Sequence, residues 1–113
     1  MIFLKYTAST LNLKDDPELI HQYIEHHRNI SQEQIDGMKS IGINRLKIFL
    51  RGRRMFMFIE TTDDYPKRKP TPEESRKGEK WQQLMHRFQE QLPDSPPDIW
   101  WAPMDEIFDL ETA

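Results

Sequence analysis

The sequence predicts an α+β fold in which one antiparallel sheet carries two helices on one of its faces. Apolar residues recur at helical spacing in two segments, and at the alternating spacing of strands in the segments between and around them. The order is strand, helix, strand, strand, helix, strand, which is the ferredoxin-like split βαβ arrangement. A chain of 113 residues fits a single domain covering residues 1–113. The expected helices are 17–40 and 79–92, and the expected strands are 1–13, 44–50, 55–61 and 99–110.

The first strand is followed by a helix with a clear start. Leu11 and Leu13 alternate with polar neighbours at the end of the strand. Asp16 can accept a hydrogen bond from a free N–H group of the first turn. Pro17 suits the first helical position because its missing N–H costs nothing there. Ser31 has the spacing of a second cap, so we expect this helix to be kinked near residues 29–32.

The middle of the chain reads as a hairpin whose second strand is apolar on both faces. A tight turn at 51–54 joins the strands at 44–50 and 55–61. A strand with two apolar faces is covered on both sides. The chain's own helices can cover one side, and nothing in so short a chain remains for the other. We therefore expect a second copy of the sheet there, in a homodimer.

The last third of the chain contains a long polar segment, a helix and a strand. Residues 62–78 hold three prolines among many charges, and we expect a solvated loop or a mobile lid. Pro93 ends the following helix, and Pro103 indicates an edge or a bulge in the final strand. The expected buried stripe of the helix is Trp81, Leu84, Met85, Phe88 and Leu92.

Composition narrows the possible partners. The net charge of −3 gives no support to non-specific nucleic-acid binding. The absence of cysteine excludes disulfides and thiol chemistry. The first ten residues lack the pattern of a signal peptide, and no segment approaches the length of a membrane span. We therefore expect a cytoplasmic protein that binds neither nucleic acid nor membrane.

The most chemically suggestive residues are Tyr23 and His27, one turn apart on the apolar face of the first helix. Histidine can donate and accept protons near neutral pH. The four histidines do not indicate a metal site, because His26 and His27 diverge on a helix and no further ligand cluster is present. By default, an isolated histidine or tyrosine on such a face is a core residue, and so is an aromatic stripe.

Five short patterns together resemble the L-rhamnose mutarotase family, some of whose members are described as L-fucose mutarotases. The resemblance covers nearly the whole chain. The patterns are Leu13-Lys14-Asp15-Asp16-Pro17-Glu18-Leu19-Ile20, Tyr23 with His27, Gly42-Ile43, Trp81 with Leu84-Met85, and Glu106-Ile107-Phe108.

The resemblance implies a dimeric α/β barrel that interconverts the anomers of a 6-deoxy-L-sugar, a monosaccharide substrate, without a cofactor. It implies that His27 and Tyr23 are catalytic and that Trp81 lies against the sugar. Gln82 stands where the family has a second tryptophan, and the segment after His27 lacks the family's aromatic residue and proline. Met85 and Trp101 are further candidates for the pocket.

Two other functions fit the same expected fold. One is a non-catalytic binding module, because RNA-recognition domains also have ferredoxin-like sheets. Arg51-Gly52-Arg53-Arg54 resembles their third-strand motif only weakly. The other is a different dimeric α/β barrel enzyme, such as a small monooxygenase or another isomerase. The fold alone does not choose among these functions.

Overall fold

The computed structural model describes residues 4–112. The sheet has the strand order β2-β3-β1-β4, with β5 also paired to β1, and all pairs are antiparallel. This is the order of a ferredoxin-like fold, and the predicted fold class is confirmed. The elements are β1 (Leu4–Leu13), α1 (Pro17–Arg28), α2 (Gln32–Ser40), β2 (Ile43–Arg51), β3 (Arg54–Thr62), α3 (Pro72–His86), β4 (Gln89–Glu90) and β5 (Ala102–Pro103).

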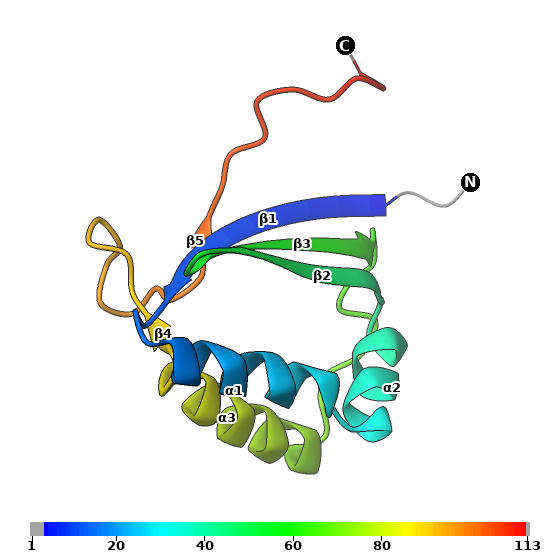
Figure 1. The fold of residues 1–113 in the computed structure, drawn as a ribbon. Helices are drawn as coiled ribbons and strands as arrows, with labels where there is room; N and C mark the ends of the chain where they lie inside the picture. The colour runs from blue at the N-terminus through cyan, green and yellow to red at the C-terminus, as the bar shows by residue number, and fades with distance from the viewer. Residues whose placement is uncertain (1–3, 113) are drawn as a thin grey trace.

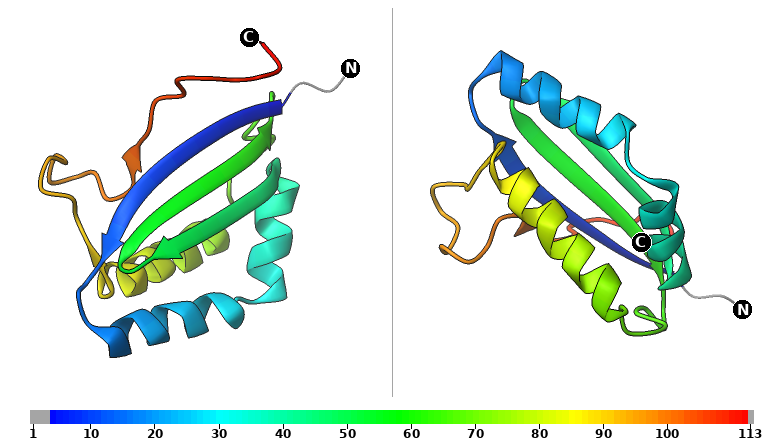
Figure 2. Two further views of the ribbon diagram at one scale, coloured as in Figure 1. Left: turned by 45° about the horizontal axis from the view of Figure 1, so that its top comes forward. Right: turned by 90° about the horizontal axis from the view of Figure 1, so that it is seen from below.

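The helices lie on one side of the sheet. Helices α1 and α3 run under one face, and α2 stands at the end of the sheet where β2 begins (Figure 1). Seen from below, α1 and α3 lie in front of the strands, with the sheet visible between them (Figure 2). The predicted hairpin is present, and Gly52 provides the positive φ of 61° that its two-residue turn requires.

The alternation of the strands divides the sheet into an inner face, toward the helices, and an outer face. The inner face contributes Leu11, Leu13 and Met55, which are almost fully buried, to the core. The outer face carries large side chains that remain exposed. Tyr6 is 50% exposed and Phe49 is 55% exposed. The second face of the sheet therefore leaves large aromatic side chains exposed in the single chain.

The predicted helix 17–40 is two helices. Helix α1 ends at Arg28 with Asn29 as its cap, and α2 begins at Gln32. Ser31 caps α2, because its Oγ accepts a hydrogen bond from the backbone N–H of Gln34 at 3.1 Å. The predicted kink is at the right position, but there the first helix ends and a second helix with its own N-cap begins.

The predicted boundaries of the last helix are wrong. Helix α3 begins at Pro72, inside the expected loop, because Thr71 and Glu74 form a capping box. It ends at His86, so Phe88 and Leu92 lie beyond the helix although both are buried. The loop after β3 is correspondingly short and covers residues 63–71.

The predicted strand at 99–110 is also wrong. Only Ala102 and Pro103 pair with the sheet, as β5, because there β1 offers them a free edge. After Met104, whose N–H still donates to the carbonyl oxygen of Ala8 at 2.9 Å, the chain leaves the sheet and runs above its outer face (Figure 1), and Ile107 is 95% exposed. Residues 1–3 of the predicted first strand lie outside the described residues. No helix within 4–112 is long and apolar enough to cross a membrane.

Candidate active site

Helix α1 presents Tyr23 and His27 to the inner face of the sheet. Its start is fixed by Asp16, whose Oδ1 accepts hydrogen bonds from the backbone N–H groups of Glu18 and Leu19 at 3.0 and 3.3 Å. Tyr23 and His27 follow one turn apart on the face toward the core. Their ring centroids are 4.4 Å apart. The two predicted catalytic side chains are therefore in direct contact.

Tyr23 is buried, and only 4% of it is exposed. Burial raises the pKa of its phenol above the ordinary value of 10.0, because the charged form loses hydration. A hydrogen bond opposes this shift, since Nε2 of Gln89 donates to the Tyr23 hydroxyl at 3.3 Å and lowers its pKa. The burial effect is the larger. At neutral pH Tyr23 is therefore a protonated phenol that can donate a hydrogen bond.

A backbone contact fixes the tautomer of His27. Its Nδ1 lies 3.0 Å from the backbone carbonyl oxygen of Tyr23. A carbonyl only accepts hydrogen bonds, so Nδ1 carries the proton in the neutral ring and Nε2 carries the lone pair. Trp81 of α3 packs edge-on against the imidazole at a centroid distance of 5.3 Å. His27 is therefore held from two sides, and Nε2 is its available acceptor.

Tyr23 and His27 line a cavity of about 330 Å³ between α1 and the strands, here called the α1 cavity. One wall carries Tyr23, His27 and Arg28 of α1. The opposite wall consists of apolar side chains from the inner face of the sheet. The other lining residues are Leu13, Ile24, Leu46, Ile48, Leu50 and Met55. The α1 cavity can thus hold a molecule that has a polar side and an apolar side.

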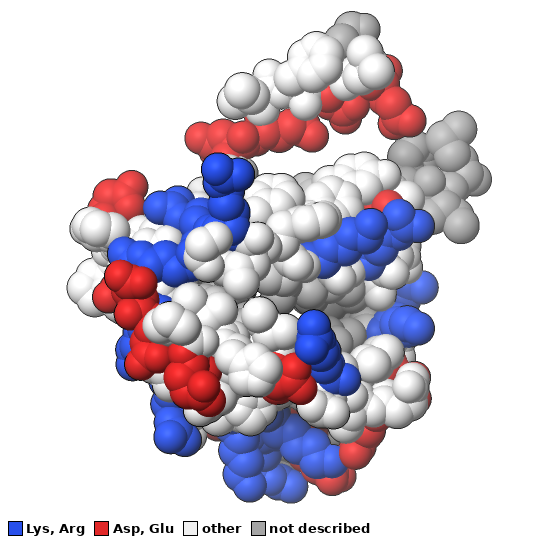
Figure 3. Space-filling view, viewed as in Figure 1, with Lys and Arg blue, Asp and Glu red and all other residues white. Residues whose placement is uncertain are grey.

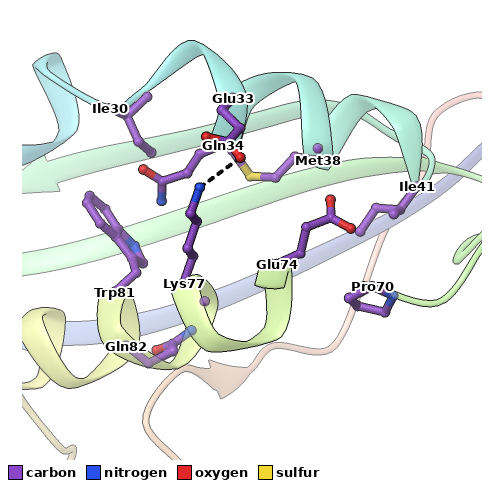
Figure 4. Close-up of a pocket in the computed structure, with 12 residues that line it drawn as sticks. Ile30, Glu33, Gln34, Met38, Ile41, Pro70, Glu74, Lys77, Trp81 and Gln82 are labelled. Atoms are coloured by element: carbon purple, nitrogen blue, oxygen red, sulfur yellow. Dashed lines mark hydrogen bonds and ion pairs between the residues drawn. The ribbon is translucent and has the colours of Figure 1, made fainter. Parts of the chain in front are cut away.

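A second cavity of about 290 Å³ lies between α2 and α3, here called the α2–α3 cavity (Figure 4). Trp81 closes one end of it, so Trp81 and His27 stand between the two cavities. Lys77 reaches across from α3 and lies 2.8 Å from a carboxylate oxygen of Glu33 on α2 (Figure 4). This ion pair links the two helices.

The far end of the α2–α3 cavity is held by Arg68. Its guanidinium donates to the Glu74 carboxylate at 2.8 and 2.9 Å, and to Oγ of Ser40 at 2.6 Å. The hydrogen bonds from Arg68 and from the backbone of Thr71 lower the pKa of Glu74 to about 2. Glu74 therefore serves both the capping box of α3 and the link to α2.

The structure brings together some of the predicted site residues and separates others. Tyr23, His27 and Trp81 form one contact group, but Trp81 lines the α2–α3 cavity and not the α1 cavity, so its predicted contact with the sugar stays a prediction. Gln82 is exposed at the lining of the α2–α3 cavity. Met85, 2% exposed, and the half-buried Trp101 pack into or against the core and line neither cavity, so their roles in binding stay predictions.

The residues after His27 do not form a polar wall of the α1 cavity. Ser31 is exposed and caps α2, and Gln32 is exposed and donates to Asp36 on the same helix at 2.8 Å. Neither residue lines either cavity. Their contacts are therefore local to the start of α2 and lie outside the α1 cavity.

Sequence reasoning missed Gln89. It was expected inside a helix, where nothing distinguishes it from the glutamines around it. In the structure it lies in β4, 2% exposed, with its amide on the Tyr23 hydroxyl. Only the pairing of β4 with β1 brings residues 66 positions apart into contact. No local sequence signal could have shown this contact.

The histidines have separate surroundings. His26 packs against Phe88 at a centroid distance of 5.4 Å, and His86 stacks on Trp100 at 3.8 Å. Residues 4–112 contain no group of three or more histidines and carboxylates placed to hold a metal ion. Tyr23 and His27 contact each other and carry the groups of this site that can donate and accept protons.

Three comparisons bear on what this site does. A family model described as L-rhamnose mutarotase matches residues 6–110. An L-fucose mutarotase of Xanthomonas campestris is 34% identical over 110 residues, covering 91% of this chain and 86% of that protein. A UPF0734 protein of Dictyostelium discoideum is 36% identical over 113 residues, covering 95% and 90%.

A solved structure has the same fold. The crystal structure of an L-rhamnose mutarotase from Formosa agariphila aligns with a TM-score of 0.68 at 19% identity, covering 94% of this chain and 98% of that one.

Proposed function

The chain belongs to the L-rhamnose mutarotase family, and on this premise we propose that it interconverts the α and β anomers of a 6-deoxy-L-hexose without a cofactor. Proteins of this family are isomerases, and this chain is one of them. L-Rhamnose and L-fucose are the sugars named by the family model and by a relative. What we propose is the identity of the substrate sugar, the catalytic residues and the order of the proton transfers.

The observation that carries the proposal is the pair formed by Tyr23 and His27 on one wall of the α1 cavity. The anomeric hydroxyl gives its proton to Nε2 of His27, while the ring oxygen receives the proton of the Tyr23 hydroxyl. The bond between C1 and the ring oxygen breaks and leaves an open-chain aldehyde. Rotation about C1–C2 and closure on the other face of the carbonyl return both protons.

The proposed reaction requires no cofactor. It moves two protons and breaks and re-forms one C–O bond, with no net oxidation or reduction. The neutral His27 ring accepts one proton, and the Tyr23 phenol supplies the other. Trp81 keeps the imidazole in place from the side away from the α1 cavity. In this proposal, catalysis comes from the positions of His27 and Tyr23 beside the sugar and from the protons that they exchange with it.

The walls of the α1 cavity favour a 6-deoxy sugar. Leu46, Ile48 and Leu50 face the polar wall across the cavity. A C6 methyl group gains from contact with such a surface, whereas a C6 hydroxyl loses a hydrogen bond to water there. We propose that the methyl group of the sugar lies against these strands and that the anomeric carbon lies near His27.

The test is anomer exchange measured at equilibrium by saturation-transfer proton NMR, with L-rhamnose and L-fucose in parallel. We expect wild-type protein to accelerate exchange, and His27→Ala to lower the rate by about 10²–10⁴-fold, the usual contribution of one acid or base. His21→Ala is the matched control, because His21 lies on the same helix and is exposed. A wild-type rate in a folded His27→Ala protein contradicts the assignment.

We also propose that two copies of the chain pack through the outer face of the sheet. Tyr6 stacks on Phe58 at 5.7 Å, and Phe49 lies 6.1 Å from Phe56, so aromatic rings cover this face. An exposed apolar surface of this kind is typical of an interaction site. The segment 104–112 adds Ile107 and Phe108, which are 95% and 68% exposed.

Charge favours a second copy as the partner of this face. The segment 104–112 is acidic along its length (Figure 3). The outer face carries basic side chains beside its aromatic rings: Arg45, Lys47, Arg51 and Arg54. Light scattering after size exclusion tests the proposal. We expect a dimer for wild type and a monomer for Phe49→Glu. A wild-type monomer, or a monomer that retains single-stranded RNA, refutes it.

A further inference from the structure

The amide of Gln89 is buried behind the proposed acid. Its side chain contacts the hydroxyl of Tyr23 from the side of β4. We propose that Gln89 is a positioning residue, which holds the Tyr23 hydroxyl and stabilises the negative charge formed when Tyr23 gives its proton to the sugar. This inference rests on the proposed function for its catalytic part, and on the hydrogen bond alone for its structural part.

Backbone contacts fix the position of Gln89. Strand β4 pairs with β1, and Gln89 is the register partner of Leu13. Lys14, which follows β1, adds a second contact: its backbone N–H donates to the carbonyl oxygen of Phe88 at 2.8 Å. Gln89 therefore lies on the inner face beside a core residue of β1. Its amide reaches Tyr23 from an element that is held by the sheet.

The direction of the hydrogen bond suits a stabiliser of charge. Nε2 of Gln89 donates to Oη of Tyr23 at 3.3 Å, so the phenol accepts this bond and its own hydrogen is free to point elsewhere. When the phenol loses that hydrogen, the same N–H faces an anion. Hydrogen bonds to charged acceptors are about twice as strong as neutral ones. The contact therefore tightens as the reaction proceeds.

Among the described residues, Gln89 is the side chain that donates a hydrogen bond to the Tyr23 hydroxyl, and the His27 ring, which gains a proton in the proposed step, is the group that can carry an opposite charge beside it. Burial raises the pKa of Tyr23, and the bond from Gln89 is the contribution that lowers it. The other core residues from β1, β3, α3 and the turn after it are uncharged: Leu11, Leu13, Met55, Met85 and Phe88. On α1 itself, His27 is the titratable group in contact with the ring.

The second polar atom of the Gln89 amide is unpaired. Oε1 of Gln89 is buried and has no hydrogen-bond partner among residues 4–112. A buried amide with one unpaired atom costs stability. An apolar residue of similar length would remove this cost, so packing alone does not account for the glutamine. Its one bond, to Tyr23, does.

The first test measures the contact without reference to any sugar. The protein is labelled with 3-fluorotyrosine, whose phenol titrates at lower pH, and the ¹⁹F signals are followed against pH while circular dichroism monitors the fold. The Tyr23 signal is the one missing in Tyr23→Phe. We expect Gln89→Met to raise the pKa of Tyr23. Gln83→Met, an exposed glutamine on α3, is the matched control and should leave it unchanged.

The second test measures the effect on the reaction. We expect Gln89→Met to lower kcat for anomer exchange by about 10-fold, the effect of one hydrogen bond to a charged group, with little change in KM. In the Tyr23→Phe background the same change should have no further effect. Gln89→Asn, whose amide is one carbon shorter, should behave as Gln89→Met does, and it serves if the methionine variant does not fold.

The outcomes separate the two proposals. An unchanged Tyr23 pKa in both Gln89 variants overturns the contact. An equal loss of kcat with and without the Tyr23 hydroxyl overturns the positioning role. If wild type exchanges the anomers of neither sugar, the proposed function fails and the catalytic part of this inference with it. The titration still decides whether Gln89 acts on Tyr23.

Discussion

Tyr23→Phe tests the buried contact through stability. The substitution keeps the ring and its packing in the core but removes Oη, the acceptor of the Gln89 amide. Gln89 is 2% exposed, and its Oε1 already has no partner within the described chain. Both polar atoms of a buried amide are then unpaired. The free energy of unfolding should fall by about 1–3 kcal/mol, the cost of leaving a buried donor unsatisfied.

Urea denaturation followed by tryptophan fluorescence measures this difference. A loss of about 1 kcal/mol should also lower the midpoint of thermal unfolding by roughly 4 °C or slightly less in a domain of this size. Tyr65→Phe is the control, because Tyr65 is 41% exposed. Adding Gln89→Met to Tyr23→Phe should recover stability, since it removes the unpaired amide. Equal stability of wild type and Tyr23→Phe refutes the reasoning.

Three further predictions concern α3, pH and the sugar. Thr71→Ala should lower stability by about 1 kcal/mol through loss of the capping box, whereas Ser75→Ala on the exposed side of α3 should not, in the same denaturation assay. The pKa of Glu74 falls from 4.5 to about 2 on folding, so its stabilising effect is full above pH 4.5 and is lost as pH falls toward 2. Glu74→Gln should lack that part of the acid-unfolding curve. Ile48→Thr should lower kcat/KM for L-rhamnose or L-fucose by about tenfold, and by less for the 6-hydroxy analogues L-mannose and L-galactose, because it makes the wall opposite His27 polar.

Local signals in the sequence were sufficient where the structure depends on neighbouring residues. Asp16 and Pro17 mark the start of α1, and helical spacing places Tyr23 and His27 on one face of it. The hairpin follows from alternation and from Gly52. These are the elements in which caps, turns and periodicity agree, so each local preference supports the same fold.

Competing local signals explain the errors in α3. Three prolines and many charges made residues 62–78 look like a loop. Yet Pro72 occupies the first turn of a helix, where proline is tolerated, and Thr71 and Glu74 supply reciprocal caps. Charged residues on the exposed faces of a helix do not prevent it from forming. The prolines and charges of this segment therefore indicate correctly that its side chains are exposed, but they do not exclude a helix.

The final strand was wrong for a different reason. Residues 99–110 have strand-like composition, but a strand needs an edge with which to pair. Strand β1 is already paired to β3 along its length and offers its other edge to β4 and β5 only in part. The apolar residues of 104–112 therefore stay exposed in the single chain. Their burial is expected only from a second copy, which no periodicity within one chain can specify.

The candidate site depends both on local contacts within α1 and on contacts between elements far apart in the sequence. The tautomer of His27 follows from the contact of Nδ1 with the backbone carbonyl of Tyr23, four residues earlier on the same helix, so this feature is local to α1. The position of Trp81 against the other side of the imidazole comes from the packing of α3 beside α1. Nδ1 is occupied by the carbonyl, and the ring is confined by the indole. The lone pair on Nε2 is then the feature of His27 left for a ligand, and Tyr23 is the polar partner in contact with the ring. In the proposed mechanism, the helix backbone and α3 thus orient Nε2 of His27 before any sugar binds.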